Sequence, residues 1–171
     1  MKLTSWNCRG FRRKRKEESL KDIIRASKSD ILLLQETKMD SQDLLKATTI
    51  LWRISQGIAE SARGASSGLG TLWNTMTFDL INSNTSMHWI HTKLLHKATG
   101  RLVSLFNIYV PHLLVRKRKC WETLKDYLLQ NDLDNIIIGG DLNVTLSLDE
   151  TKCGSIVRDP AREWVEDIMS E

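Results

Sequence analysis

Four apolar stretches of the sequence end in side chains that can bind a metal ion or donate a hydrogen bond to an oxyanion. The residues at these ends are Asn7, Glu36, Tyr109, and the neighbouring pair Asp141 and Asn143. In α/β sheets the ligand cleft forms at the carboxyl ends of the strands, so we expect these side chains to meet there. A single carboxylate in such a place could be a helix cap or a turn former, but the repeated ending favours a functional site.

The residue types at these ends narrow the chemistry. The carboxylates of Glu36 and Asp141 are hard oxygen ligands, which favour Mg²⁺ or Mn²⁺ over zinc. Asn7 and Asn143 are neutral and can orient a phosphate or a water molecule without repelling an anion, while Tyr109 offers a hydroxyl donor. The sequence has no GxxxxGK[ST] loop, which argues against phosphate binding of the NTPase kind. Together these residues favour metal-assisted hydrolysis of a phosphodiester, with the metal ion as Lewis acid.

The elements that must position these residues begin with a strand, a helix and a strand. Residues 2–6 alternate apolar and polar side chains, and residues 30–34 form a short apolar run, both typical of strands. Between them Leu20, Ile23 and Ile24 follow helical spacing. This order predicts a βαβ unit and therefore an α/β protein.

The middle of the chain is rich in predicted strands. They are GLGTLW at 68–73, TFDLI at 77–81, MHWIHTKLL at 87–95 and LVSLFNIYV at 102–110, with turn-like NSNTS and HKATG segments between the later ones. A meander of hairpins fits this spacing, so we expect a mixed sheet. A second amphipathic helix, marked by Trp121, Leu124 and Leu128, is expected after a basic run and before a strand at 135–138.

Length and composition set the outer bounds. With 171 residues, 41% of them hydrophobic, the chain can bury the core of one domain. No apolar run is long enough to cross a bilayer and no secretory signal is visible, so we expect a nuclear or cytoplasmic location and no membrane partner. The cysteines, 3 in number and widely spaced, favour free thiols over a zinc site or a disulfide framework. The oligomeric state is left open.

Two basic runs stand out against a modest net charge of +4. The first is Arg12, Arg13, Lys14, Arg15 and Lys16, and the second is Arg116, Lys117, Arg118 and Lys119. The simplest interpretation is that each is a solvated helix end. A contact with a nucleic-acid backbone and a nuclear-localisation-like patch are the alternatives, and the sequence does not separate the three.

Five segments, in order along the chain, are similar to motifs of the endonuclease/exonuclease/phosphatase superfamily. They are WNCRG at 6–10, LLLQETK at 32–38, SGLGTLW at 67–73, NIYVP at 107–111 and GGDLN at 139–143. Within this superfamily HWIHTKLLH, GGDLNVTLSLDE and SIVRDPAREWVEDIM resemble the endonuclease domain of LINE-type (non-LTR) retrotransposon polyproteins of plants. The resemblance covers nearly the whole chain.

The resemblance implies a four-layer α/β sandwich of two mixed sheets with outer helices. It also implies that Glu36 binds a divalent metal, Mg²⁺ or Mn²⁺, helped by Asn7, and that Tyr109 approaches the scissile phosphate. Asp141 would activate or orient the attacking water, and Asn143 would hold this water and the phosphate. The substrate would be DNA, nicked on one strand so that a reverse transcriptase, a possible partner domain in the full-length relative, can extend the 3′ end.

Two departures from the family pattern bear on activity. Repair relatives carry an acid two residues after the first-motif asparagine, where this chain has Arg9. The family's closing segment, which holds an aspartate and a Ser-Asp-His motif, is not matched before Glu171. Asp159 and Pro160 start a helix whose apolar face, with Trp164 and Val165, needs a surface to pack on. We therefore expect one domain over residues 1–171 that lacks its C-terminal part and its C-terminal strands.

Three functions remain open at this point. The chain could be a metal-dependent DNA-nicking endonuclease, impaired by its missing part. It could be a non-catalytic, decayed retroelement fragment that at most binds nucleic acid, or a superfamily phosphoesterase on a non-DNA substrate. His112 lies close in sequence to Tyr109, but a loop histidine is usually only exposed, so we do not expect it to replace the family's histidine.

Overall fold

The computed structural model describes residues 1–12, 14–62, 67–145 and 159–170. The chain divides into two compact units. The first comprises Met1–Tyr109 and Asp134–Asp141, and the second comprises Val110–Leu133 and Leu142–Glu171. Whether residues 1–171 form one domain stays a prediction. No helix among the described residues is long and apolar enough to cross a membrane.

The first sheet of the first unit contains the predicted βαβ unit. Its strands are β1 (Leu3–Asn7), β2 (Ile31–Gln35), β4 (Leu69–Asn74) and β3 (Ser55–Glu60), in this spatial order. Helix α1 (Lys14–Ser27) connects β1 to its parallel neighbour β2, and α2 (Ser41–Leu51) follows β2. The remaining pairs, β2 with β4 and β3 with β4, are antiparallel, so this sheet is mixed.

The second sheet of the first unit is also mixed. Its strands are β5 (Phe78–Thr85), β6 (Trp89–His96), β7 (Arg101–Tyr109) and β8 (Ile136–Asp141), again in spatial order. The first three form an antiparallel meander, and β8 runs parallel to β7. The predicted α/β fold of two mixed sheets with helices is therefore confirmed.

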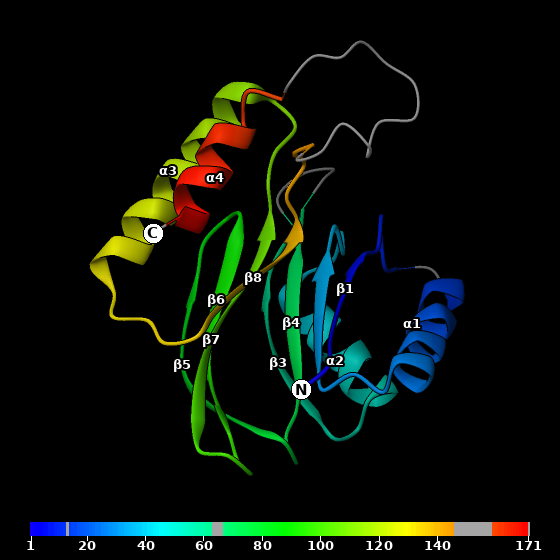
Figure 1. The fold of residues 1–171 in the computed structure, drawn as a ribbon. Coiled ribbons are helices and arrows are strands. Elements are labelled where there is room, and N and C mark those ends of the chain that lie inside the picture. The colour runs from blue at the N-terminus through cyan, green and yellow to red at the C-terminus, as the bar shows by residue number, and fades with distance from the viewer. Residues whose placement is uncertain (13, 63–66, 146–158, 171) are drawn as a thin grey trace. The chain divides into compact units, whose positions relative to one another are not determined.

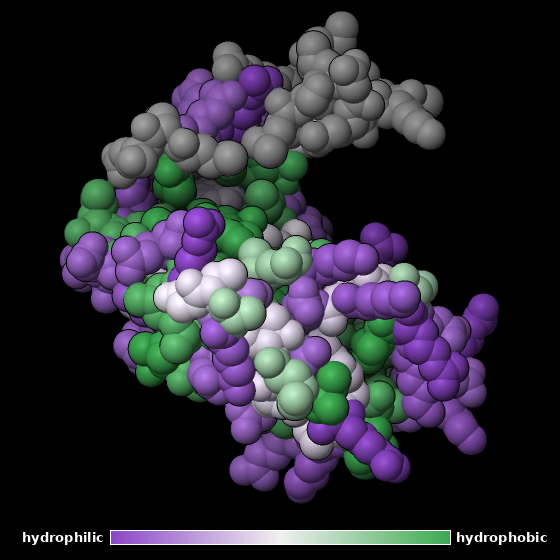
Figure 2. All heavy atoms as spheres, turned by 60° about the horizontal axis from the view of Figure 1, so that its bottom comes forward, coloured by the Kyte–Doolittle hydropathy of each residue, from purple (hydrophilic) through white to green (hydrophobic). Residues whose placement is uncertain are grey.

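Strand β2 lies in the middle of the first unit, and all of its residues are buried. Ile31 and Leu33 pack in one cluster with Leu94 and Leu105 of the second sheet, so the two sheets lie face to face. The alternate residues of β2 face the helices, in a cluster that contains Leu32, Leu34, Leu20 of α1 and Leu44 of α2. Figure 1 shows both helices on this side of the first sheet. The hydrophilic surface of α1 stands at the right of Figure 2.

The second unit is built on two helices, α3 (Leu114–Gln130) and α4 (Arg162–Ser170). Asp159 precedes α4 and stabilises the turn that leads into it: its Oδ1 accepts a hydrogen bond of 2.9 Å from the Ala161 amide, and its carbonyl accepts one of 3.0 Å from the Arg162 amide. The predicted helix is present, but it begins at Arg162 and not at Asp159 and Pro160, which lie in the turn before it. Cys8 of the first unit and Cys120 of α3 are free and buried, as expected, while Cys153 lies outside the described residues.

Three predictions about the elements were wrong. The segment NSNT belongs to β5 and is not a turn; most of this edge strand is exposed, so it carries no hydrophobic alternation. GLGTLW does not join the meander, because β4 pairs with β2 and β3 in the other sheet. The second basic run does not precede a helix but lies inside α3. Strand β3 and helix α2 have weak signals and were not anticipated.

Candidate active site

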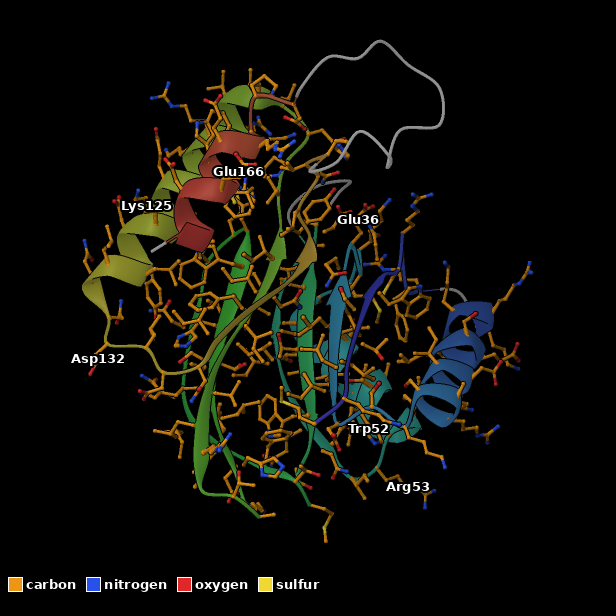
Figure 3. The ribbon with its side chains drawn as sticks, viewed as in Figure 1. Glu36, Trp52, Arg53, Lys125, Asp132 and Glu166 are labelled. Atoms are coloured by element: carbon orange, nitrogen blue, oxygen red, sulfur yellow. The ribbon has the colours of Figure 1, made fainter. Side chains whose placement is uncertain are left out.

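The parallel strand pairs of the first unit bring four of the predicted residues to strand ends. Asn7 ends β1 beside Gln35 on β2, and Glu36 follows directly. In the second sheet Tyr109 ends β7 and is paired with Asp141 at the end of β8. Figure 3 shows Glu36 at the opposite end of the first unit from Trp52 and Arg53.

The carboxamide of Asn7 joins the two carboxylates. Its Nδ2 donates hydrogen bonds to Glu36 Oε1, at 2.9 Å, and to Asp141 Oδ2, at 2.6 Å. The two carboxylate oxygens are therefore no farther apart than these two distances taken together, which suits a shared metal ion. Asn7 Oδ1 accepts the Arg9 amide at 3.1 Å, so the geometry suits a residue that positions the carboxylates rather than one that supplies an oxygen ligand.

Glu36 is held in an unusual conformation. Its φ is +49°, in the left-handed region that non-glycine residues seldom occupy, and its carbonyl accepts the Gly10 amide at 2.7 Å. Its second carboxylate oxygen, Oε2, lies 4.0 Å from Lys38 Nζ. Strain of this kind is concentrated at functional sites, where the surrounding structure enforces it.

The donor set fits a hard divalent cation. Within the part of the chain that the structure describes, no group of three or more His, Cys, Asp or Glu side chains could hold a metal ion. Two carboxylates without a histidine or a thiolate match Mg²⁺, which binds through one or two carboxylates and keeps water or phosphate oxygens as its other ligands. The same set is a poor zinc site.

Tyr109 stands beside both carboxylates and is buried. Burial raises the pKa of its phenol to about 12, and the charges of Glu36 and Asp141 and a hydrogen bond to Glu36 act in the same direction. The phenol therefore stays protonated at any physiological pH. It is a hydrogen-bond donor and not a base.

Replacing Tyr109 by Phe should remove a late step from the ultraviolet titration of tyrosine, near pH 12. A raised pKa means that the folded state favours the neutral phenol. This contribution to stability is complete below the unfolded-state value of 10.0 and is lost as the pH rises to about 12. Unfolding in urea should show this loss in the wild type and not in Tyr109→Phe. Tyr127→Phe is the control, and a late step that survives in Tyr109→Phe would refute the assignment.

Asn143 belongs to the second unit, and its surroundings are those of that unit. Its φ is +47°, its Nδ2 donates to the Val110 carbonyl, and its own carbonyl accepts a hydrogen bond from Lys117. The role assigned to it from the resemblance stays a prediction.

A buried amide network supports the first-unit site and was not foreseen from the sequence. Gln35 Nε2 donates to Asn107 Oδ1 at 2.7 Å, and Asn107 Nδ2 donates to the carbonyls of Leu34 and Gly70. Both side chains are buried, and their hydrogen bonds connect the two sheets. Gln35 directly precedes Glu36 in the sequence, and Asn107 lies two residues before Tyr109. The available signal was that Gln35 and Asn107 lie inside the apolar segments LLLQETK and NIYVP. An amide buried in such a segment needs a hydrogen-bond partner.

The two basic runs differ in how many of their side chains are exposed and so available to contact a nucleic acid. In the first, Arg12, Lys14 and Arg15 are exposed, Lys16 lies 5.4 Å from the Trp6 ring centre, and Arg13 is outside the described residues. In the second, the side chains of Arg116, Arg118 and Lys119 are exposed.

Lys117 corrects the prediction for the second run. It is buried, its ammonium donates to the Asn143 carbonyl, and it lies 3.4 Å from Asp159 Oδ2. It is therefore neither a solvated helix end nor a surface contact for phosphate.

The sequence as a whole matches a family model. The model describes the endonuclease/exonuclease/phosphatase family and matches residues 4–152. The chain belongs to this family. A search of curated proteins found no match.

Solved structures show the same fold at low identity. AP endonuclease LMAP from Leishmania major has a TM-score of 0.77 and 19% identity, over 99% of this chain and 66% of that one. An AP endonuclease from Archaeoglobus fulgidus has a TM-score of 0.76 and 18% identity, over 99% of this chain and 70% of that one. A 3′ phosphatase from Neisseria bound to a product DNA hairpin has a TM-score of 0.73 and 15% identity, over 99% and 70%. This chain of the endonuclease/exonuclease/phosphatase family thus spans 66% of the length of the LMAP chain.

Proposed function

We propose that the chain carries the metal-dependent phosphodiesterase centre of a DNA-nicking endonuclease of the LINE retrotransposon type. The observation that supports this most directly is the Asn7 carboxamide, hydrogen-bonded at once to Glu36 and Asp141. Family membership supports phosphoester hydrolysis, and the similar structures named above include DNA-processing enzymes. The LINE assignment depends on the resemblance of the motifs.

Each residue has a distinct part in this proposal. A divalent ion, Mg²⁺ or Mn²⁺, held by Glu36 would act as Lewis acid on a phosphoryl oxygen. Asp141 accepts a proton from the attacking water, and Asn7 keeps the two carboxylates at a fixed separation. With substrate bound, the neutral hydroxyl of Tyr109 turns from Glu36 and donates to oxygens on which negative charge builds, and Asn143 holds the water and the phosphate.

The deciding experiment is nicking of supercoiled plasmid by the full chain with Mg²⁺ or Mn²⁺, with and without EDTA. Metal-dependent conversion to open circles supports the proposal, and Glu36→Ala should stop it. DNA binding without nicking would favour the decayed retroelement fragment. Without nicking, the DNA has no new 3′ end that a reverse transcriptase could extend.

A phosphoesterase acting on a lipid head group has one observation in its favour. Three apolar side chains at the start of α3, Leu113, Leu114 and Val115, are 63%, 49% and 83% exposed. Exposed apolar residues beside a basic run are typical of membrane-surface segments. Hydrolysis of phosphate esters in vesicles, with no nicking of plasmid, would favour this alternative.

The first basic run should give the DNA affinity a salt dependence. If Arg12 and Arg15 each neutralise a phosphate, changing both to Gln should reduce the slope of log K against log salt by about 1.8, at about 0.9 for each phosphate. Lys46→Gln with Arg53→Gln, two exposed residues outside the runs, is the matched control and should leave the slope unchanged. Equal slopes for the two double variants would leave the run as a solvated helix entry.

A further inference from the structure

Lys117 is buried where its neighbours are not. Its side chain is 9% exposed, whereas Arg116, Arg118 and Lys119, the other members of the run, are exposed. A lysine is almost never buried without a partner, because removing the ammonium from water is costly. Lys117 has two partners in the second unit, the Asn143 carbonyl at 2.5 Å and Asp159 Oδ2 at 3.4 Å.

Asp159 makes contacts on both sides of its carboxylate. Its Oδ1 accepts from the Ala161 amide in the turn that leads into α4. Its Oδ2 instead faces Lys117 and accepts a hydrogen bond of 3.4 Å from the Thr145 amide. The ion pair therefore holds the segment 143–145 at both ends, since the cation binds the Asn143 carbonyl and the anion binds the Thr145 amide.

The segment held in this way has little freedom. Asn143 has a φ of +47°, which asparagine tolerates better than most residues, and its Nδ2 donates to the Val110 carbonyl. Its backbone carbonyl and its carboxamide nitrogen are thus both fixed. The carboxamide oxygen then has one direction, and rotation of the side chain would break the bond to Val110.

We propose that Lys117 and Asp159 are positioning residues for Asn143. The ion pair sets the backbone of residues 143–145, and through it the direction of the Asn143 carboxamide. The catalytic part of this inference rests on the proposed function, in which Asn143 holds the water and the phosphate. The run RKRK accordingly contains two kinds of residue, one lysine that orders the second unit and three exposed cations.

The test uses the full chain with two variants and one control. Lys117→Met removes the charge and keeps an unbranched side chain, and Asp159→Asn removes the partner charge while keeping a residue that caps helices well. Arg118→Met is the control, since Arg118 is exposed and forms a surface ion pair with Glu122 at 2.8 Å. Hydrogen exchange of the Val144 and Thr145 amides is measured together with kcat and KM for nicking.

Both variants should raise exchange at Val144 and Thr145 and lower kcat by about 10- to 100-fold, with KM little changed, as the loss of a supporting residue typically does. Arg118→Met should leave exchange and kcat unchanged. Exchange that stays at the wild-type level in both variants overturns the proposal, as does an unchanged kcat per folded molecule. If the wild type does not nick at all, the proposed function fails, and the exchange data alone decide whether the pair holds the segment. If Lys117→Met does not fold, Asp159→Asn carries the test.

Discussion

Glu36→Gln should abolish Mn²⁺ binding and lower the rate of plasmid nicking by about 10²–10³-fold or more. A metal Lewis acid contributes several kcal/mol to the transition state, and about 1.4 kcal/mol corresponds to a factor of ten in rate. Glutamine keeps the size of the side chain and an oxygen that can accept from Asn7 Nδ2, as Glu36 Oε1 does at 2.9 Å. The hydrogen bond from Tyr109 can persist for the same reason. The variant therefore removes a negative charge and little else.

The measurement is the electron paramagnetic resonance signal of free Mn²⁺ in a titration with protein, followed by nicking under the same conditions. Asp30→Asn is the matched control. Asp30 directly precedes the amino end of β2, has a side chain that is 26% exposed, and accepts a hydrogen bond of 2.8 Å from the Lys2 amide. This change should leave Mn²⁺ binding and nicking intact. If Glu36→Gln binds Mn²⁺ as tightly as Asp30→Asn does, the metal site lies elsewhere.

Sequence reasoning predicted the strand ends well because the relevant signals are local. The apolar run before Glu36 and the alternation before Asn7 each define a strand within a few residues. A βαβ connection then puts both ends at the same edge of one sheet, which the parallel register of β1 and β2 confirms.

The contact of Asn7 with Asp141 could not be derived in the same way. It joins residues 134 positions apart, on different sheets, and depends on the packing of β2 against the second sheet. The burial of Lys117 could not be predicted from the sequence either. Lys117 looks like its neighbours in the run, and only the arrangement of Asn143 and Asp159 around it explains why it is buried. The extent of β5 was predicted wrongly for a related reason: a strand with little buried surface shows no alternation of apolar and polar residues in its sequence.

The glycines before Asp141 are also explained by packing. A Cβ on Gly139 would lie 2.8 Å from Leu33 Cδ1, on the facing sheet, where a flexible side chain can give way. A Cβ on Gly140 would overlap the Ile108 carbonyl oxygen and lie 2.7 Å from the Ile108 nitrogen, on the backbone of β7. Gly140 also has a φ of +132°. Glycine at these two positions therefore allows β8 to approach the facing sheet and the backbone of β7 closely, directly before Asp141.

Gly140→Ala should therefore destabilise the protein by about 2–6 kcal/mol, since a strained φ and a steric overlap each cost about 1–3 kcal/mol. The measurement is the midpoint of urea unfolding, with tryptophan fluorescence as the signal. Gly100→Ala is the matched control: Gly100 has a φ of +66°, but nothing lies within 4 Å of its added Cβ. It should cost only the backbone strain, about 1–2 kcal/mol.

The same substitution should also affect the site. Strand β7 is also paired with β6 on its other side, so we expect the added methyl to displace the edge strand β8, and with it Asp141, from the register that pairs Tyr109 with Asp141. The 2.6 Å hydrogen bond from Asn7 to Asp141 would then be lost, so any folded Gly140→Ala protein should bind Mn²⁺ more weakly than Gly100→Ala. Equal stabilities and equal Mn²⁺ affinities in the two alanine variants would show that the close approach of Gly140 to Ile108 does not position Asp141.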